Sequence, residues 1–115
     1  MPDNCIFCQI IQGKSPARII HQDEEVTVFW DIAPKTPVHL LIVPNRHFDS
    51  LNELQEADAA LLGRLCLTAA RLAAEQGIGE SGYRLVINTG PDAGQSVSHL
   101  HLHLIGGRQM PVFFG

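Results

Sequence analysis

His99-Leu100-His101-Leu102-His103-Leu104-Ile105 alternates imidazole and aliphatic side chains without interruption. Because successive side chains of a β-strand point to opposite faces, this pattern predicts a half-buried strand with all three imidazoles on one face. Imidazole titrates close to neutral pH, so it can attack, exchange protons or bind metal. The polar face of this histidine row is therefore the first candidate for a functional site.

The length of the row limits what one metal ion can bind. At about 3.3 Å of rise per residue, the backbones of His99 and His103 lie about 13 Å apart, whereas the ligands of one zinc ion lie a few ångströms from each other. One ion cannot easily take all three imidazoles, although adjacent ones could share a metal. The sequence therefore predicts different tasks for the three histidines.

Length and composition indicate a single domain over residues 1–115. The chain is 45% hydrophobic and 17% charged, which suits one compact globule with a modest core. A net charge of −4 and scattered basic residues argue against binding a nucleic-acid polymer. The chain has neither an apolar run of about 18 residues nor a secretory signal, so we expect a cytoplasmic protein that does not enter the membrane.

Periodicity and chain breakers predict an α+β fold, a five-stranded antiparallel sheet with one long helix and a short N-terminal helix. The long helix is expected from about Glu53 to Gln76, with a buried thiol at Cys66 and an apolar stripe of Leu61, Leu62, Leu65 and Leu72. The short helix is expected at residues 6–12, and the strands at residues 18–21, 26–31, 38–43, 83–88 and 99–105.

A loop of residues 89–96, here called the glycine loop, directly precedes the histidine row. Gly90 and Gly94 allow backbone conformations in which several N–H groups converge on one anion, and Gln95 and Ser96 add neutral donors. Such a loop is often only a hairpin connection. Its position next to His99 favours a phosphate site.

Cys5-Ile6-Phe7-Cys8 has the spacing of a zinc-binding pair. Redox chemistry is the alternative, but nothing typical of a thioredoxin surrounds the pair. A tetrahedral site needs two further ligands, and His47 and His99 are the candidates. His21, beside an acidic turn, is expected to be an ordinary surface residue.

The histidine row resembles the signature of the histidine triad family. Asn88-Thr89-Gly90, Gly94-Gln95-Ser96-Val97 and Gly106-Gly107-Arg108-Gln109-Met110 are similar to its Hint branch. So are Asp31-Ile32-Ala33-Pro34 and Pro37-Val38-His39-Leu40-Leu41-Ile42-Val43-Pro44, so the similarity extends from about Cys5 to Met110. The resemblance implies a purine nucleoside phosphoramidase, which cleaves the P–N bond of purine nucleoside 5′-monophosphoramidates.

The resemblance also implies a role for each matching residue. His101 is the nucleophile that forms a covalent nucleotidyl-histidine, Ser96 helps to protonate the leaving amine, and His39 supports the orientation of the nucleophile. His103 and the glycine loop hold the phosphate, and the substrate-binding residues there are Asn88, Gly94, Gln95, Ser96 and Val97. Asp31 binds the ribose, and the base pocket is lined by Phe7, Ile10, Phe29, Trp30 and Ile32. A structural zinc is held by Cys5, Cys8, His47 and His99, no catalytic metal is required, and the protein is a homodimer.

Three other functions stay open at this stage. The chain could be a dinucleotide polyphosphate hydrolase or nucleotidyl transferase of the same family, a hydrolase that uses the histidine row as a catalytic zinc site, or a nucleotide-binding scaffold with incidental turnover. One departure concerns substrate choice. Pro111-Val112-Phe113-Phe114-Gly115 stands where Hint proteins commonly have a Trp-Pro-Pro-Gly-like tail, which lies near the partner subunit's active site in that family.

Overall fold

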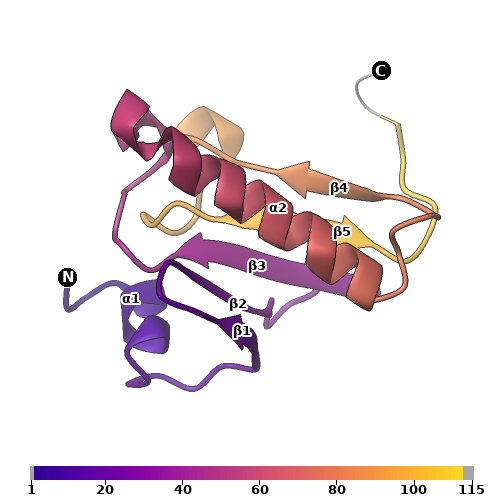
Figure 1. Ribbon diagram of the computed structural model, residues 1–115, viewed down its shortest axis with the longest axis horizontal. Coiled ribbons are helices and arrows are strands. Elements are labelled where there is room, and N and C mark those ends of the chain that lie inside the picture. The colour runs from indigo at the N-terminus through magenta and orange to yellow at the C-terminus, as the bar shows by residue number, and fades with distance from the viewer. Residues whose placement is uncertain (1, 113–115) are drawn as a thin grey trace.

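The computed structural model describes residues 2–112 and contains one sheet with a long helix across one face (Figure 1). The strands are antiparallel and follow the spatial order β1-β2-β3-β5-β4. They are β1 (Ile19–Gln22), β2 (Val26–Trp30), β3 (Val38–Pro44), β4 (Tyr83–Val86) and β5 (Leu102–Gly106). The helices are α1 (Ile6–Ile11) and α2 (Ala59–Glu75), with 3-10 turns at Leu51–Glu53, Glu56–Asp58 and Pro91–Ala93. The expected α+β fold is confirmed.

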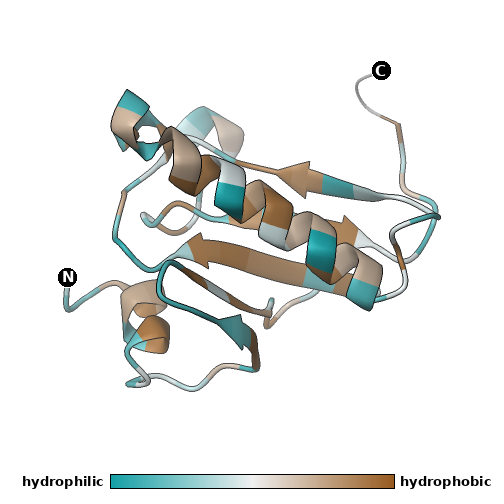
Figure 2. Ribbon diagram, viewed as in Figure 1, coloured by the Kyte–Doolittle hydropathy of each residue, from teal (hydrophilic) through white to brown (hydrophobic). Residues whose placement is uncertain are grey.

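The central strand β3 is buried along its whole length. Leu40 and Ile42 belong to the core under α2, whereas Leu41 and Val43 pack with α1 on the opposite face. Figure 2 shows most of β3 as hydrophobic, which is typical of a strand covered on both faces. The face that carries α1 is the one on which the histidines gather.

The long helix begins later than the sequence predicts. Leu54 is extended, with φ −71° and ψ 140°, and so separates two 3-10 turns from each other. The Asp58 carboxylate then accepts a hydrogen bond from the Gln55 N–H at 2.9 Å, and α2 starts at Ala59. The expected stripe is confirmed, because Leu65 and Leu72 are buried while Leu61 and Leu62 pack partly buried against the same core.

The expectation of a buried thiol at Cys66 is wrong, because this side chain is exposed. Consecutive helical residues are rotated by about 100° around the axis. Leu65 points into the core with 0% exposure, so its neighbour Cys66 turns away from the sheet, as does Leu67 with 73% exposure.

The histidine row is extended, but β5 begins only at Leu102. Strand pairing stops at Ile42–Leu102 on one side, although β3 continues to Pro44, and at Val86–His103 on the other, where β4 ends. The expected strand start at His99 is therefore wrong. The alternation nevertheless persists, because the leucines at positions 100, 102 and 104 all belong to the core under α2.

The other strand ends agree with expectation or differ by one residue, except that the strand expected at 83–88 ends at Val86. Within residues 2–112, no helix is both long and apolar enough to cross a bilayer. Of the unusual C-terminal tail, residues 113–115 lie outside the described residues.

Candidate active site

The three imidazoles of the histidine row lie on the sheet face covered by α1. The ring centroids of His101 and His103 are 5.0 Å apart, and the Phe7 ring of α1 lies 5.1 Å from His101 and 5.9 Å from His99. His99 and His101 are only 0% and 5% exposed. Each ring has different polar neighbours, so the row is divided among three environments.

His101 is held by the main chain of its own row. The His99 carbonyl lies 2.7 Å from Nδ1 of its ring, so Nδ1 carries the proton and donates it. Burial lowers the pKa of His101. The ring is therefore neutral at physiological pH, with the lone pair of Nε2 left for the cavity that His101 lines.

His103 is held by His39 from the neighbouring strand β3. The Lys35 N–H donates to Nδ1 of His39 at 3.0 Å, so the proton of this neutral ring is on Nε2. That Nε2 lies 2.9 Å from Nδ1 of His103, which must then accept. The relay leaves His103 with an N–H at Nε2. His39 thus orients His103, whereas the resemblance had assigned it to the nucleophile.

Asp31, His39 and His103 also have potential ligand atoms within 4.8 Å of one another. Asp31 Oδ2 lies 3.4 Å from His39 Nε2. A metal at this trio would need the lone pair of His39 Nε2, but the Lys35 N–H fixes a proton there. The hydrogen bonds therefore favour a relay over a catalytic metal site.

The neutral His103 predicts a loss of stability in mild acid. Burial lowers the pKa of His103 from 6.5 to about 4. Between these values the unfolded chain binds a proton that the folded chain does not, so the free energy of unfolding falls as the pH decreases and is fully restored above 6.5. We expect urea unfolding to show this slope and His103→Gln to make it shallower, while the buried His99 and His101, whose pKa values are also lowered, keep part of it.

The carboxylate of Asp23 affects stability outside the pH range from 6.5 to 4. A backbone hydrogen bond from Glu25 lowers the pKa of Asp23 from 3.8 to about 2, so Asp23 contributes only in stronger acid. If His103→Gln keeps the wild-type slope between pH 6.5 and 4, the buried neutral state assigned to His103 is wrong.

A cavity of about 1040 Å³ opens beside His101 and His103. Most of the side chains expected around a nucleotide line it, namely Phe7, Ile10, Phe29, Trp30, Asp31, Ile32, Ser96 and Val97. Its wall is largely apolar at α1 and β2. The cavity thus brings an apolar surface, one carboxylate and two imidazoles together.

Some expected residues lie differently. Asn88, Gly94, Gln95 and His39 are not among the lining residues. The Ile32 side chain is fully exposed at the rim, and Trp30 packs partly against the core under α2. The Nε1 of Trp30 is buried and has no hydrogen-bond partner within residues 2–112.

The sequence reasoning missed Ile6, Leu41 and residues 15–18, which also line the cavity. Leu41 could have been found, because strand alternation places it two residues beyond His39 on the same face of β3. Residues 15–18 lie in the connection between α1 and β1, where periodicity gives no direction for side chains.

The glycine loop has the backbone that its glycines predict. Gly90 and Gly94 have φ of +83° and +77°, which favour glycine because L side chains rarely adopt them. Gln95, however, directs its amide inward. Its Oε1 accepts from the Gly90 N–H, and its Nε2 donates to the carbonyls of Val97 and Asp49.

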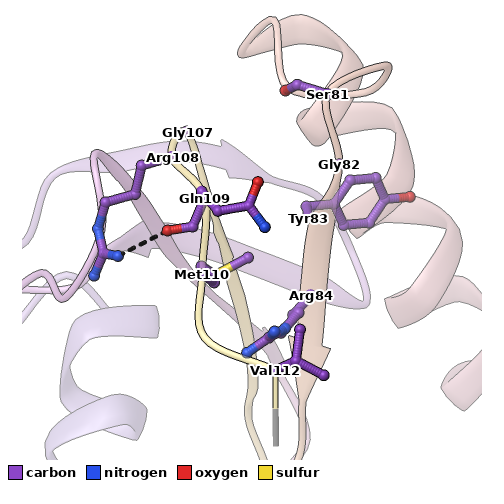
Figure 3. Close-up of a pocket in the computed structure, with 9 residues that line it drawn as sticks. All are labelled: Ser81, Gly82, Tyr83, Arg84, Gly107, Arg108, Gln109, Met110 and Val112. Atoms are coloured by element: carbon purple, nitrogen blue, oxygen red, sulfur yellow. Dashed lines mark hydrogen bonds between the residues drawn. The ribbon is translucent and has the colours of Figure 1, made fainter. Parts of the chain in front are cut away.

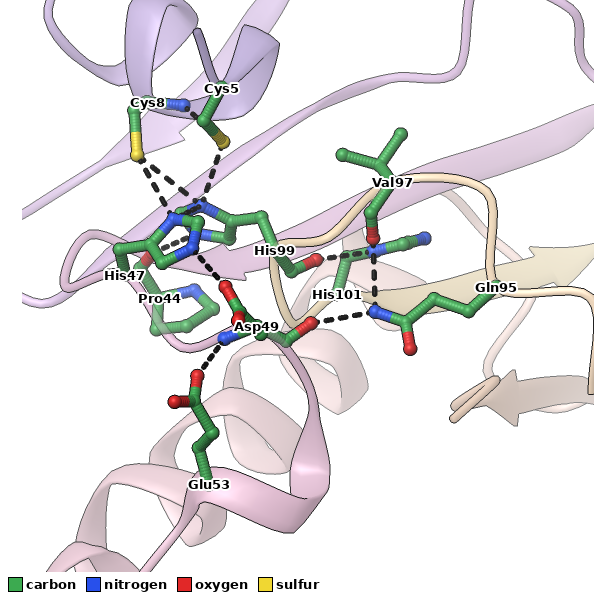
Figure 4. Close-up of polar contacts among 10 residues, drawn as sticks. All are labelled: Cys5, Cys8, Pro44, His47, Asp49, Glu53, Gln95, Val97, His99 and His101. Atoms are coloured by element: carbon green, nitrogen blue, oxygen red, sulfur yellow. Dashed lines mark hydrogen bonds and ion pairs between the residues drawn. The ribbon is translucent and has the colours of Figure 1, made fainter. Parts of the chain in front are cut away.

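Cys5, Cys8, His47 and His99 converge beside this loop (Figure 4). The Sγ of Cys5 lies 3.4 Å from Nδ1 of His99, and the Sγ of Cys8 lies 3.3 Å from Nδ1 of His47. The two Nδ1 atoms are 3.1 Å apart. Ligand atoms of a tetrahedral zinc site lie about 3.3–3.8 Å from each other, so these four residues, here called the metal cluster, have nearly the spacing of such a site.

The tautomers of the metal cluster also fit a cation. His99 Nε2 lies 2.9 Å from the Pro44 carbonyl, and His47 Nε2 lies 2.7 Å from Asp49 Oδ1. Both Nε2 atoms therefore carry the proton, and two Nδ1 lone pairs face each other and the sulfurs. Burial, with the nearby Cys5 thiol, raises the pKa of Cys8 to about 11 in the metal-free protein. A bound cation would stabilise the thiolates and separate the lone pairs.

A second hollow of about 370 Å³ lies at the other end of β4 and β5 (Figure 3). Its charged lining residues are Arg84 and Arg108, and each donates to a main-chain carbonyl, of Pro111 and of Gln109 respectively. It contains neither a histidine nor a carboxylate among its lining residues. The histidine cavity is therefore the candidate active site.

Comparison with known proteins identifies the family of the chain. A family model described as "Scavenger mRNA decapping enzyme C-term binding" matches residues 4–113. The purine nucleoside phosphoramidase of Escherichia coli (strain K12) is 43% identical over 110 residues, which cover 96% of this chain and 92% of that protein.

Solved structures agree over nearly the whole chain. A HIT family hydrolase from Legionella pneumophila has a TM-score of 0.92 at 45% identity and covers 94% of this chain and 96% of its own. A zinc-bound histidine triad family protein from Mycobacterium smegmatis has a TM-score of 0.79 at 35% identity, over 91% of this chain and 76% of its own. Together with the histidine row and its cavity, these similarities show that the chain belongs to the histidine triad family of hydrolases.

Proposed function

We propose that this protein is a purine nucleoside phosphoramidase that works through a covalent intermediate on His101. The hydrogen bond from His101 Nδ1 to the His99 carbonyl carries the proposal, because it holds the proton of the buried, neutral ring on Nδ1 and so leaves the lone pair of Nε2 free beside the cavity. The name of the Escherichia coli relative supports the choice of a P–N bond as the target.

The reaction runs in two displacements at phosphorus. Nε2 of His101 attacks, the bond from phosphorus to Nε2 forms, and the P–N bond to the amine breaks as the leaving nitrogen takes up a proton. Ser96, which lines the cavity, would help to protonate this leaving nitrogen. Water then cleaves the bond to Nε2, releases the nucleotide and restores the neutral imidazole.

His103 supplies an electrostatic contribution to both displacements. Since the relay from Lys35 and His39 leaves an N–H on its Nε2, it can donate to a phosphate oxygen throughout the reaction. Backbone N–H groups of the glycine loop would add further donors. Such preorganised donors stabilise the charge of the transferring phosphoryl group without a catalytic metal.

The rest of the cavity suits a purine nucleoside. Asp31 has one carboxylate oxygen fixed by the Ala33 N–H at 2.8 Å, which orients the group for the ribose hydroxyls. Phe7 and Phe29 lie 5.3 Å apart in an edge contact and give the base an apolar wall with Ile10. Because this wall is apolar, it favours stacking with either purine over hydrogen bonding to one of them.

The metal cluster would hold one zinc ion through Cys5, Cys8, His47 and His99. Zinc bound by four protein ligands has no open position and serves to stabilise the fold. The zinc-bound relative from Mycobacterium smegmatis supports the choice of metal. We place this single domain in the cytoplasm.

We further propose a homodimer. Strand β4 is an edge of the sheet, and the apolar side chains of Leu67, Leu85 and Val112 are exposed on α2, on β4 and after β5. A partner would cover that edge and these side chains. Sedimentation velocity at micromolar concentration should show a dimer, and a purely monomeric protein would contradict this part of the proposal.

A substrate panel tests the proposed function. Adenosine and guanosine 5′-phosphoramidates should be hydrolysed faster than P–O–P and P–F compounds of the same nucleosides. Faster cleavage of dinucleotide polyphosphates would favour the family's other activity. AMP binding without measurable turnover of any compound in the panel would instead indicate a nucleotide-binding scaffold.

A further inference from the structure

Gln95 uses its whole side-chain amide inside the protein. Oε1 accepts from the Gly90 N–H at 2.9 Å, and Nε2 donates to the Asp49 carbonyl at 2.7 Å and to the Val97 carbonyl at 3.0 Å. The main chain adds a hydrogen bond from the Gln95 N–H to the Gly90 carbonyl at 3.2 Å. Both ends of the glycine loop are thus fastened to one side chain, which leaves that amide no donor for a substrate.

The same amide connects the loop to the metal cluster. Asp49, whose carbonyl accepts from Gln95, also accepts from Nε2 of His47 through its carboxylate at 2.7 Å. The other ring nitrogen of His47 faces Cys8 and His99. Figure 4 shows the connection from the cysteines through His47 and Asp49 to Gln95 and on to Val97.

We propose that Gln95 is a positioning residue that holds the glycine loop in the shape that receives the α-phosphate and couples this loop to the metal ligand His47. The inference rests on the proposed function, because it concerns the phosphate of a bound nucleotide. It replaces the expectation that Gln95 contacts the substrate. Ser96 and Val97, which follow Gln95 directly, line the cavity, so the loop is positioned where the phosphate would be bound.

The isosteric change Gln95→Glu tests the role. It keeps the acceptor for Gly90 but places an oxygen where Nε2 now donates to two carbonyls, which turns two hydrogen bonds into repulsions. We expect the loop to open and the affinity for AMP to fall about tenfold. Adenosine has no phosphate, so its affinity should change by less than about twofold.

The readout is the dissociation constant of adenosine divided by that of AMP, both measured by calorimetry on the zinc-loaded protein. This ratio falls when the affinity for AMP alone falls. Gln22→Glu is the matched control, because Gln22 also donates two hydrogen bonds, to the Ile11 carbonyl and to Thr27 Oγ1, but lies on β1. It should keep the wild-type ratio. Gln95→Ala should lower the ratio as Gln95→Glu does. It replaces Gln95→Glu in the test if the glutamate variant does not fold.

Two further measurements separate positioning from direct contact. Amide exchange at Gly90 in the nucleotide-free protein should accelerate in Gln95→Glu. Chelation of the metal should lower the preference of wild type for AMP over adenosine more than that of Gln95→Glu. In the variant the hydrogen bond from residue 95 to Asp49, which connects the loop to the metal cluster, is already lost. If chelation unfolds the chain, amide exchange decides.

A variant with the wild-type ratio overturns the inference, and so does a lowered ratio with unchanged exchange at Gly90, which would make Gln95 a direct phosphate contact. Failure of the proposed function looks different. In that case wild type itself would fail, either by showing no turnover of the phosphoramidates or by binding AMP no better than adenosine.

Discussion

Replacing His101 with alanine is expected to lower the hydrolysis of adenosine 5′-phosphoramidate by about 10⁴-fold or more. The variant loses the Nε2 that attacks phosphorus, and the neighbouring imidazoles cannot substitute for it. His103 has its Nδ1 engaged by His39, and His99 has its Nδ1 among the cysteines. AMP should still bind, because the base wall, Asp31 and the glycine loop lie elsewhere. Steady-state kinetics and calorimetry on the same preparation would show binding without chemistry.

His21→Ala is the control for the loss of an imidazole. His21 pairs with Asp23 at 2.7 Å and lies near the Arg71 guanidinium, outside the lining of the cavity. Its rate should stay within a few-fold of wild type. If His101→Ala retained wild-type turnover, the nucleophile would be another group and the zinc-hydrolase alternative would gain support.

Loss of the metal should have the largest effect on stability. We expect purified protein to contain about one zinc per chain and Cys5→Ser to lower the free energy of unfolding by more than about 3 kcal/mol. Cys5 is the N-cap of α1, Cys8 lies within the helix, and His47 and His99 come from distant segments, so the ion would fasten α1 to the sheet. Without it, two imidazole lone pairs face each other at 3.1 Å.

Cys66→Ser provides the matched control, because it makes the same chemical change at an exposed thiol outside the metal cluster. It should change the free energy of unfolding by less than about 0.5 kcal/mol. Elemental analysis and denaturant unfolding together check the prediction. Metal-free wild type with the same stability as the loaded protein would rule the zinc assignment out.

The sequence predicted well those segments in which residue types repeat at a fixed spacing. The alternation from His99 to Ile105 placed three leucines in the core and three imidazoles on the other face, even though hydrogen-bonded pairing starts only at Leu102. The Cys5–Cys8 spacing and the length of the row correctly separated His99 from the other two histidines.

The parts that it missed depend on contacts between distant segments. The start of α2 depends on a hydrogen bond from the Gln55 N–H to the Asp58 carboxylate. Both residue types also occur inside helices, so the sequence alone does not mark this start. The partner of His39 follows from strand register, because β3 lies next to β5 and Leu41 is opposite His103. The use of Gln95 as an internal brace requires Asp49 to lie beside the glycine loop, which no local pattern encodes.

Trapping the covalent intermediate tests the central claim most directly. Rapid quenching of wild type with an adenosine phosphoramidate labelled in the nucleotide should yield a protein-bound nucleotide that is acid-labile, as a bond between phosphorus and imidazole nitrogen is. Peptide mapping should place the label on His101 and find none in His101→Ala. A label on any other residue, or turnover with no trapped nucleotide at any quench time, would contradict the account.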